Sequence, residues 1–413
     1  MNFLDELMDS TKELEPPRNF WWWSGLAAIS AVLIDNVWLP RGEQKDSTNV
    51  YYKCYPNIYV MLHADSGLKK GPPVNLAKTL VSKVGNTKII SGRSSIQAIL
   101  KELIGTAHTE PGGKIIQQKC AAFIVSSEFS SSLVEDKASM TILTDLYDRN
   151  WNDGAWDSLL KMEKFTLKDP TLSMLVATNE AHFDDFIGMK DVNGGFIGRM
   201  FIISERSTAT LNPLINELER VPDREGLTNY LKTLTNLRGP FQSLRANTSG
   251  KIYHDWYMDF YENVRDQHVK DDTGTIQRFG ESVLKVAMCL ALSKKPELII
   301  EPAVMLEAIT RCEALVSNVR RATLGKKGKA SNVHLKNLII NELLNREPHV
   351  ITRDVLMKKF WMHYESADAL GEIMTDFGQA GLLRVENRGN TVIYIMDDSM
   401  VKKIQEHLSG KSE

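Results

Sequence analysis

A short segment bearing glycine and lysine follows an apolar run near residue 60, and its residue types are suited to phosphate chemistry. Residues 58–62 are apolar, residues 63–71 read His-Ala-Asp-Ser-Gly-Leu-Lys-Lys-Gly, and Pro72 and Pro73 suit the first turn of a helix. A strand, a turn with free backbone N–H groups, a lysine and a helix N-terminus are the parts that hold a nucleotide's phosphates. We therefore expect Lys70 to bind phosphate. The expected nucleotide-binding residues are Ser66, Gly67, Leu68, Lys69, Lys70 and Gly71.

This loop departs from the usual G-x-x-x-x-G-K-[ST] pattern at several positions. Ala64 and Lys69 stand where the two glycines belong, and Gly71 stands where a Ser or Thr belongs. That missing hydroxyl normally ligates Mg²⁺, so the metal would depend on water, on the nucleotide or on a carboxylate elsewhere. The ligands of a metal therefore stay unidentified. Taken alone, the loop fits an ordinary turn with solvated lysines equally well.

Two further polar residues follow apolar segments that read as strands. Glu128 comes after residues 121–125 and stands where a catalytic base would polarise water, but Ser127 replaces the aspartate that usually binds Mg²⁺. Asn179 comes after residues 172–177 and could sense the γ-phosphate or orient water. The alternatives are a solvated strand-end glutamate and a helix N-cap, respectively.

An arginine precedes the last expected strand. Arg199 follows the glycine-rich residues 194–198, and a ring ATPase would use such an arginine as a finger into the neighbouring subunit's nucleotide. An exposed arginine after a turn is the alternative. The expected catalytic residues are thus Glu128, Asn179 and Arg199, and their order along the chain after Lys70 favours an ATPase more than any one motif does.

The elements that must position these residues indicate an α/β protein. Residues 1–50 read as an N-terminal helical segment, and residues 51–210 alternate apolar strands with helices, as expected of a parallel sheet buried on both faces. Residues 211–323 read as helical, and 324–332 have linker composition. Residues 333–407 read as three helices followed by a hairpin, which is the winged-helix order.

Composition narrows the class of protein. The chain has 413 residues, 43% hydrophobic and 25% charged, with a net charge of -2, which is typical of a soluble protein of two or three domains. The four cysteines form no C-x-x-C pair, which argues against structural zinc or disulfides and indicates a cytoplasmic location. Polar residues interrupt the apolar stretch 20–39, so we expect no membrane span.

At these residues the chain resembles a P-loop family of phage and mobile-element replication modules, usually described as helicase- or primase-helicase-like. The resemblance rests on Phe3, Phe20 and Trp22, on residues 27–31 and 55–60, and on the variant loop 66–74. It covers roughly residues 1–320. It implies a RecA/AAA+-like P-loop NTPase core, ATP and Mg²⁺ as cofactors, and a homo-oligomer, for which a ring is one arrangement. It also implies action on DNA, a replication partner, and a bacterial or phage-infected host cell.

We expect the protein to contact DNA in its single-stranded form, and we consider three regions for this contact. Residues 150–169 combine Trp151 and Trp156 with lysines, as a channel loop would, although a solvated hairpin packed by its tryptophans also fits. The third helix of the winged-helix-like domain is acidic, which suits protein docking better than a major groove. The candidate DNA-binding residues are Lys161, Lys164, Lys168 and, in the wing, Arg388. Arg278 fits either a lid arginine or a surface ion pair.

These observations favour an oligomeric ATPase motor of phage or mobile-element DNA replication. The alternative is a non-hydrolysing P-loop scaffold or loader that binds DNA or a replication partner, as Gly71 and Ser127 suggest. A third hypothesis is a transcriptional regulator that binds DNA through the winged-helix-like domain. The acidic third helix of that domain argues against this hypothesis.

Overall fold

The computed structural model describes most of the chain in two units. The described residues are 2–43, 50–91, 95–104, 108–109, 115–116, 120–129, 137–149, 155–160, 163–179, 182–183, 195–212, 218–245, 247–266, 274–324, 336, 339–360, 367–388 and 391–408. The first unit is Met1–Val319 and the second is Arg320–Glu413. Within the described part of the chain, no helix is both long and apolar enough to cross a membrane.

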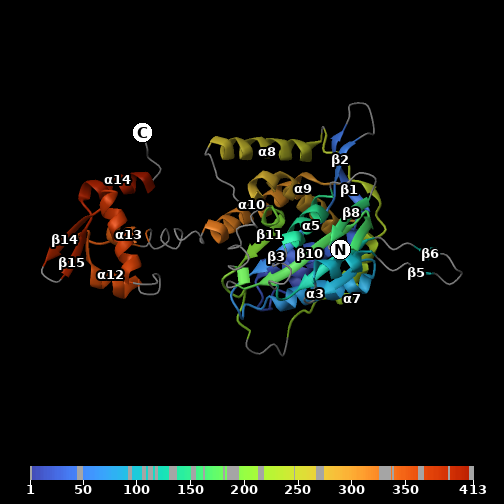
Figure 1. Cartoon of the computed structure of the whole chain (residues 1–413), viewed down its shortest axis with the longest axis horizontal. Helices are drawn as coiled ribbons and strands as arrows, with labels where there is room; N and C mark the ends of the chain where they lie inside the picture. Colours follow the sequence, from blue (N-terminus) through green and yellow to red (C-terminus); the bar gives the residue numbers. More distant parts are fainter. Residues whose placement is uncertain are drawn as a thin grey trace. The chain divides into compact units, whose positions relative to one another are not determined.

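A five-stranded parallel sheet forms the centre of the first unit, which confirms the expected α/β class (Figure 1). Its strand order is β11-β3-β10-β7-β4. The strands are β3 (Tyr59–His63), β4 (Lys88–Ser91), β7 (Ala121–Ser126), β10 (Thr171–Thr178) and β11 (Met200–Ser204). All residues of β3 and β10 are buried, because helices cover both faces of the sheet.

The path of the chain through this sheet singles out the carboxyl end of β3. After β3 it moves to the far edge at β4, returns through β7 and β10, and adds β11 on the other side of β3. The connection that leaves β3 and the connection that leaves its neighbour β10 therefore run in opposite directions across the sheet. In open parallel sheets, ligands bind beyond the carboxyl ends of the strands at such a point.

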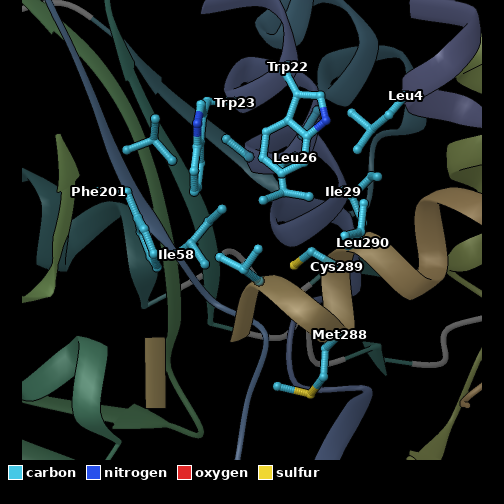
Figure 2. Close-up of a cluster of buried hydrophobic side chains, with 14 of the residues drawn as sticks. Leu4, Trp22, Trp23, Leu26, Ile29, Ile58, Phe201, Met288, Cys289 and Leu290 are labelled. Carbon is cyan, nitrogen blue, oxygen red and sulfur yellow. The ribbon is translucent and has the colours of Figure 1, made fainter. Parts of the chain in front are cut away.

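Two N-terminal helices, separated by a proline pair, contribute many side chains to the core. They are α1 (Phe3–Ser10) and α2 (Arg18–Leu33), and nearly every residue of α2 is buried. Trp23 stacks on Phe201 of β11 with ring centroids 5.2 Å apart (Figure 2). Ser30 bonds to Ser173 at 2.8 Å and accepts from the Ile58 backbone N–H at 3.1 Å, so it fixes α2 against the sheet.

The remaining helices of this unit pack around the sheet, and most of them contribute apolar side chains to the same core cluster. Helix α3 lies beside α7 on one side of the sheet (Figure 1). The helices are α3 (Gly71–Val84), α4 (Ile96–Leu103), α5 (Lys137–Asp148), α7 (Arg224–Leu234), α8 (Thr248–Asp266), α9 (Thr275–Lys294) and α10 (Pro302–Leu324). The segments 1–50, 51–210 and 211–323 thus share one hydrophobic core.

Small sheets complete the first unit. A three-stranded sheet has the order β12-β1-β2, with β1 at Val37–Glu43, β2 at Val50–Cys54 and β12 at Gly239–Pro240. Two hairpins precede β7 and β10. They are β5 (His108–Thr109) with β6 (Ile115–Ile116), and β8 (Ala155–Leu160) with β9 (Glu163–Lys168).

The second unit has its own core around Leu356, Ile373 and Phe377. Residues 339–344 are helical and lead into β13 (Val350–Thr352), α12 (Arg353–Phe360), α13 (Ala367–Gln379), β14 (Arg384–Arg388), β15 (Thr391–Ile395) and α14 (Asp398–Leu408). Its antiparallel sheet has the order β13-β15-β14. The expected linker, 324–332, belongs to this second unit, which begins at Arg320. Residues 325–332 lie outside the described residues.

Candidate functional site

The loop between β3 and α3 encloses the lysine that the sequence singled out. Lys70 Nζ donates hydrogen bonds to the carbonyl oxygens of Ala64 at 2.7 Å and Asp65 at 2.8 Å. Gly67 has φ +93° and Lys69 has φ +50°, so the backbone turns sharply between them. Lys70 therefore lies along its own loop at the carboxyl end of β3, where a phosphate could take the place of the two carbonyl groups.

Two carboxylates act on the Lys70 ammonium. Partial burial lowers the pKa of Lys70 below the usual lysine value, and the negative charges of Asp65 and Glu128 oppose that shift. Glu128 is exposed just beyond β7, two strands away from β3. Its electrostatic influence on Lys70 shows that the sheet brings the predicted lysine and the predicted acidic residue to one edge. These carboxylates could hold a cation beside a bound phosphate.

Gly71 begins α3 and leaves open space where a side chain would stand. A Cβ built on Gly71 meets no other atom within 4 Å. A hydroxyl-bearing residue would therefore fit at this position without displacing anything. The absence of the usual metal ligand is a property of the residue type, since neither the helix nor its surroundings excludes a serine.

Hydrogen bonds hold Glu128 in a short turn after its strand. Ser126 Oγ donates to the Glu128 carbonyl oxygen at 2.6 Å, and the Phe129 N–H donates to the Ala177 carbonyl oxygen at 2.6 Å. Ser127, at the position of the usual metal-binding aspartate, is exposed. The backbone after β7 is thus fastened to β10, while the side chains of residues 127 and 128 face solvent.

Asn179 follows β10 at the same edge and acts as a cap. Its Oδ1 accepts from the His182 N–H at 2.9 Å, and its carbonyl oxygen accepts from the Phe183 N–H at 2.9 Å. The alternative role as a capping residue is therefore confirmed for its oxygen. The Ala64 N–H donates to the Thr178 carbonyl oxygen at 3.4 Å, which joins the start of the phosphate loop to the strand that carries Asn179.

Arg199 lies at the opposite end of the parallel strands, where the strands begin. It precedes Met200, which pairs with Tyr59 at the amino end of β3, and the five residues of β3 separate it from the loop by ~16 Å at the usual rise per residue. Its side chain is only 5% exposed and forms an ion pair with Asp148, with Nε donating to Oδ1 at 2.7 Å. Arg199 also donates to the Gly195 carbonyl oxygen at 2.6 Å. The structure thus does not bring Arg199 to the phosphate loop of its own chain.

The candidate DNA-binding residues are distributed over both units. Strands β8 and β9 pair as a hairpin and Trp156 is buried, in agreement with the alternative for this segment, while Trp151 lies outside the described residues. Lys168 is exposed on β9, the side chain of Lys164 on the same strand is not described, and Lys161 lies outside the described residues. Arg388 of the second unit is exposed and paired with Glu386 at 2.9 Å.

Three residues near the loop were not anticipated from the sequence. His63 ends β3, and its Nδ1 hydrogen-bonds to Ser204 Oγ at 2.9 Å. Arg206 is exposed two residues beyond Ser204, which is the register partner of His63. Because carboxyl ends of parallel strands share one edge, Arg206 adds a cation near the loop. A search for charged residues after every strand would have found it.

Within the described segments, no three His, Cys, Asp or Glu side chains are arranged to hold a metal ion. No protein-family model matches the chain, and no curated protein matches it.

Proposed function

We propose that this protein binds ATP at the β3–α3 loop and hydrolyses it as an oligomeric motor that acts on DNA during phage or mobile-element replication. The observation that carries the proposal is the position of Lys70. Its ammonium lies in a turn after a buried strand, at the point where the strand order reverses, and a carboxylate from a nearby strand acts on it. These are the parts that a phosphate-binding loop of this class requires.

Each residue at this edge has a proposed role. Lys70 and the backbone N–H groups of residues 66–71 bind the β- and γ-phosphates, and Glu128 orients the attacking water. Asn179 contacts the γ-phosphate through its side-chain nitrogen, because its oxygen already accepts from the His182 N–H. Mg²⁺, when bound, neutralises the phosphate charge, with Asp65 and Glu128 as the nearby carboxylates.

The position of Arg199 supports an oligomer within this proposal. An arginine at the amino edge of the sheet cannot reach the loop of its own chain across ~16 Å. If Arg199 acts on a nucleotide, that nucleotide must belong to a second copy, and the Asp148 pair must open first. Mixing Lys70→Ala with Arg199→Ala protein tests this directly, since each variant supplies what the other lacks and mixed oligomers should regain turnover.

The arrangement of the second unit supports a winged-helix assignment. A helix, β13, α12, α13 and the β14–β15 hairpin follow in the winged-helix order, and β13 pairs with β15. On α13, Asp376 forms an ion pair with Lys336 at 2.7 Å, and Glu372 adds a further negative charge. We propose that this unit docks a replication partner, and that the exposed Lys168 of the first unit belongs to the DNA-contacting surface.

The test is ATP turnover with and without single-stranded DNA. Wild-type protein should hydrolyse ATP faster with DNA, and Lys70→Ala should abolish both binding and turnover. Lys69→Ala is the matched control, because Lys69 is a neighbouring lysine whose ammonium lies 3.6 Å from Glu15 instead of within the loop. If Lys70→Ala keeps wild-type nucleotide affinity, the proposed site is wrong.

A second function is favoured by two residues at the same edge. Gly71 and Ser127 remove both side chains that usually bind Mg²⁺, which suits a scaffold or loader that binds nucleotide without hydrolysing it. The turnover of Glu128→Gln separates the two functions. A motor loses hydrolysis in this variant while keeping affinity, whereas a scaffold shows no hydrolysis in wild type either.

A further inference from the structure

A cavity of about 200 Å³ lies at the amino edge of the sheet, away from the phosphate loop. The segment before β3, the end of α5, the start of α9 and strand β2 line it. Lys53 and Tyr52 of β2 are exposed, so the cavity opens to solvent there. Its volume is far larger than the ~30 Å³ of one water molecule, and its lining is mostly polar.

The lining carries an excess of positive charge. Five cationic side chains face two carboxylates, those of Asp148 and Glu281. The cations are Lys53, Arg149, Arg199, Arg278 and Lys285. Asp148 pairs with Arg199, and Glu281 lies 3.7 Å from Lys285. Both carboxylates are thus already engaged, and Asp35 and Asp169, which lie outside the lining, act on Arg149. In the described part of the chain no carboxylate pairs with Arg278 or Lys53, so these two positive charges favour the entry of an anion.

Arg278 is the cation best placed to receive such an anion. It donates to the Gly274 carbonyl oxygen at 3.2 Å, and no other acceptor among the described residues takes its remaining guanidinium donors. No carboxylate in the described part of the chain forms an ion pair with it. Lys285 differs, because it is 2% exposed and donates to the Tyr55 carbonyl oxygen at 3.1 Å and to Asn57 Oδ1 at 2.8 Å. Lys285 holds the wall of the cavity, while Arg278 faces its interior with donors to spare.

The hydroxyl of Tyr147 gives an independent indication of a ligand. Tyr147 lines the cavity and is 4% exposed, and its hydroxyl has no hydrogen-bond partner among the described residues. Burial raises the pKa of Tyr147 well above its usual value, so the group stays a neutral donor. Buried hydroxyls without a partner are uncommon, and an oxyanion in the cavity would supply the acceptor that this one lacks.

We propose that this cavity binds a phosphate-type oxyanion, held by Arg278, Tyr147 and Lys53, as a site separate from the phosphate loop. A tetrahedral dianion matches the two charges of Arg278 and Lys53 and accepts hydrogen bonds from several directions, whereas a carboxylate offers one charge in one plane. The anion has two possible sources, free phosphate or the terminal phosphate of a nucleotide carried by a second copy. Both share this chemistry.

Binding of inorganic phosphate to full-length Lys70→Ala protein tests the site, because this background removes the lysine of the loop. Calorimetry at fixed ionic strength should show one phosphate site. Arg278→Gln should weaken binding about tenfold or more through loss of a charge-assisted hydrogen bond, and Tyr147→Phe about fivefold. Lys295→Gln, at the other end of α9 and exposed, is the control and should bind as the background does.

A thermal shift distinguishes a ligand role of Tyr147 from a packing role. Without phosphate, Tyr147→Phe should melt at the same temperature as its background or higher, because it removes a hydroxyl without a partner. With phosphate, it should gain less stability than its background does. The proposal would be overturned if Lys70→Ala protein bound no phosphate. It would also be overturned if Arg278→Gln and Tyr147→Phe, made in that background, bound phosphate with the same affinity as the background itself.

Sedimentation identifies the source of the anion. Phosphate binding by dilute monomer supports the free ion. A non-hydrolysable ATP analogue that makes wild type self-associate, but not Arg278→Gln, supports the nucleotide of a second copy. Nucleotide affinity at the Lys70 loop should be equal in those two proteins. If neither behaviour occurs, the cavity is not an oxyanion site.

Discussion

Replacing Gly71 with serine should restore a metal ligand to the phosphate loop. Gly71 is the first residue of α3, its φ lies outside the left-handed region, and a Cβ there meets nothing within 4 Å. A serine therefore fits the backbone as it stands. Its hydroxyl would occupy the position that usually binds the Mg²⁺ of the nucleotide.

The size of the effect follows from two separate contributions. Replacing glycine at a compatible position stabilises a fold by ~0.4–1 kcal/mol through the unfolded chain, independently of any ligand. A hydrogen bond or ligand bond to a charged group contributes ~1.5–3 kcal/mol, which corresponds to about 10- to 100-fold in affinity for the Mg²⁺ nucleotide. Gly71→Ala supplies only the first contribution and is the matched control.

The assay is nucleotide binding and turnover measured against Mg²⁺ concentration. Both Gly71→Ala and Gly71→Ser should melt slightly higher than wild type, and only Gly71→Ser should reach half-maximal activity at lower Mg²⁺. Adding Ser127→Asp, at an exposed position beside Glu128, should lower the Mg²⁺ requirement further. If Gly71→Ser and Gly71→Ala have the same Mg²⁺ dependence, the metal does not lie beside residue 71, and the proposed geometry of the site is wrong.

Three other perturbations test the fold and the site. Ser30→Ala should destabilise the first unit by ~1–3 kcal/mol in denaturant unfolding, because it leaves the buried Ile58 N–H and Ser173 hydroxyl without their bonds. The four cysteines are all buried, and burial raises the pKa of Cys54 to about 12, so iodoacetamide at about pH 8 should modify unfolded but not native protein. Burial lowers the pKa of Lys70 below 10.5, so nucleotide binding that needs the ammonium should be complete below that lowered pKa and decline as the pH rises through it. Lys70→Arg, which stays charged, should remove the decline in a pH titration with a fluorescent ATP analogue.

Local patterns in the sequence were sufficient for the sheet strands and for the loop that follows β3. The apolar runs at 121–125 and 172–177 match β7 and β10 within a residue at each end. Strands buried on both faces give continuous apolar runs bounded by polar residues, so the pattern is strong where the sheet is central. The mostly exposed strand β2 has no such apolar run, and the sequence did not predict it as a strand.

Pairings between distant segments could not be predicted in this way. Arg199 was expected as an exposed finger or an exposed turn residue, and it is buried against Asp148, which lies 51 positions earlier. A sequence shows that an arginine is present but not which carboxylate the fold brings to it. The same holds for the cavity, whose lining comes from four separate segments. The sequence offers Arg278 as a lid arginine or a surface ion pair, and only the fold shows its place in the cavity beside Gly195.

Lys70 at the carboxyl end of the strands and Arg199 at their amino end are held with different strength. In the proposed oligomer, this difference sets the order in which nucleotide binds and the arginine is released. Among the described residues, Lys70 donates to two neutral carbonyl groups, so a phosphate can replace them at little cost. Arg199 is held by a carboxylate in a buried position, and breaking such a pair costs about 3–5 kcal/mol unless another anion compensates. Nucleotide would therefore bind at the loop before any finger acts. Release of Arg199 would follow only when a second copy brings a compensating phosphate to the amino edge, where Arg278 already has donors to spare.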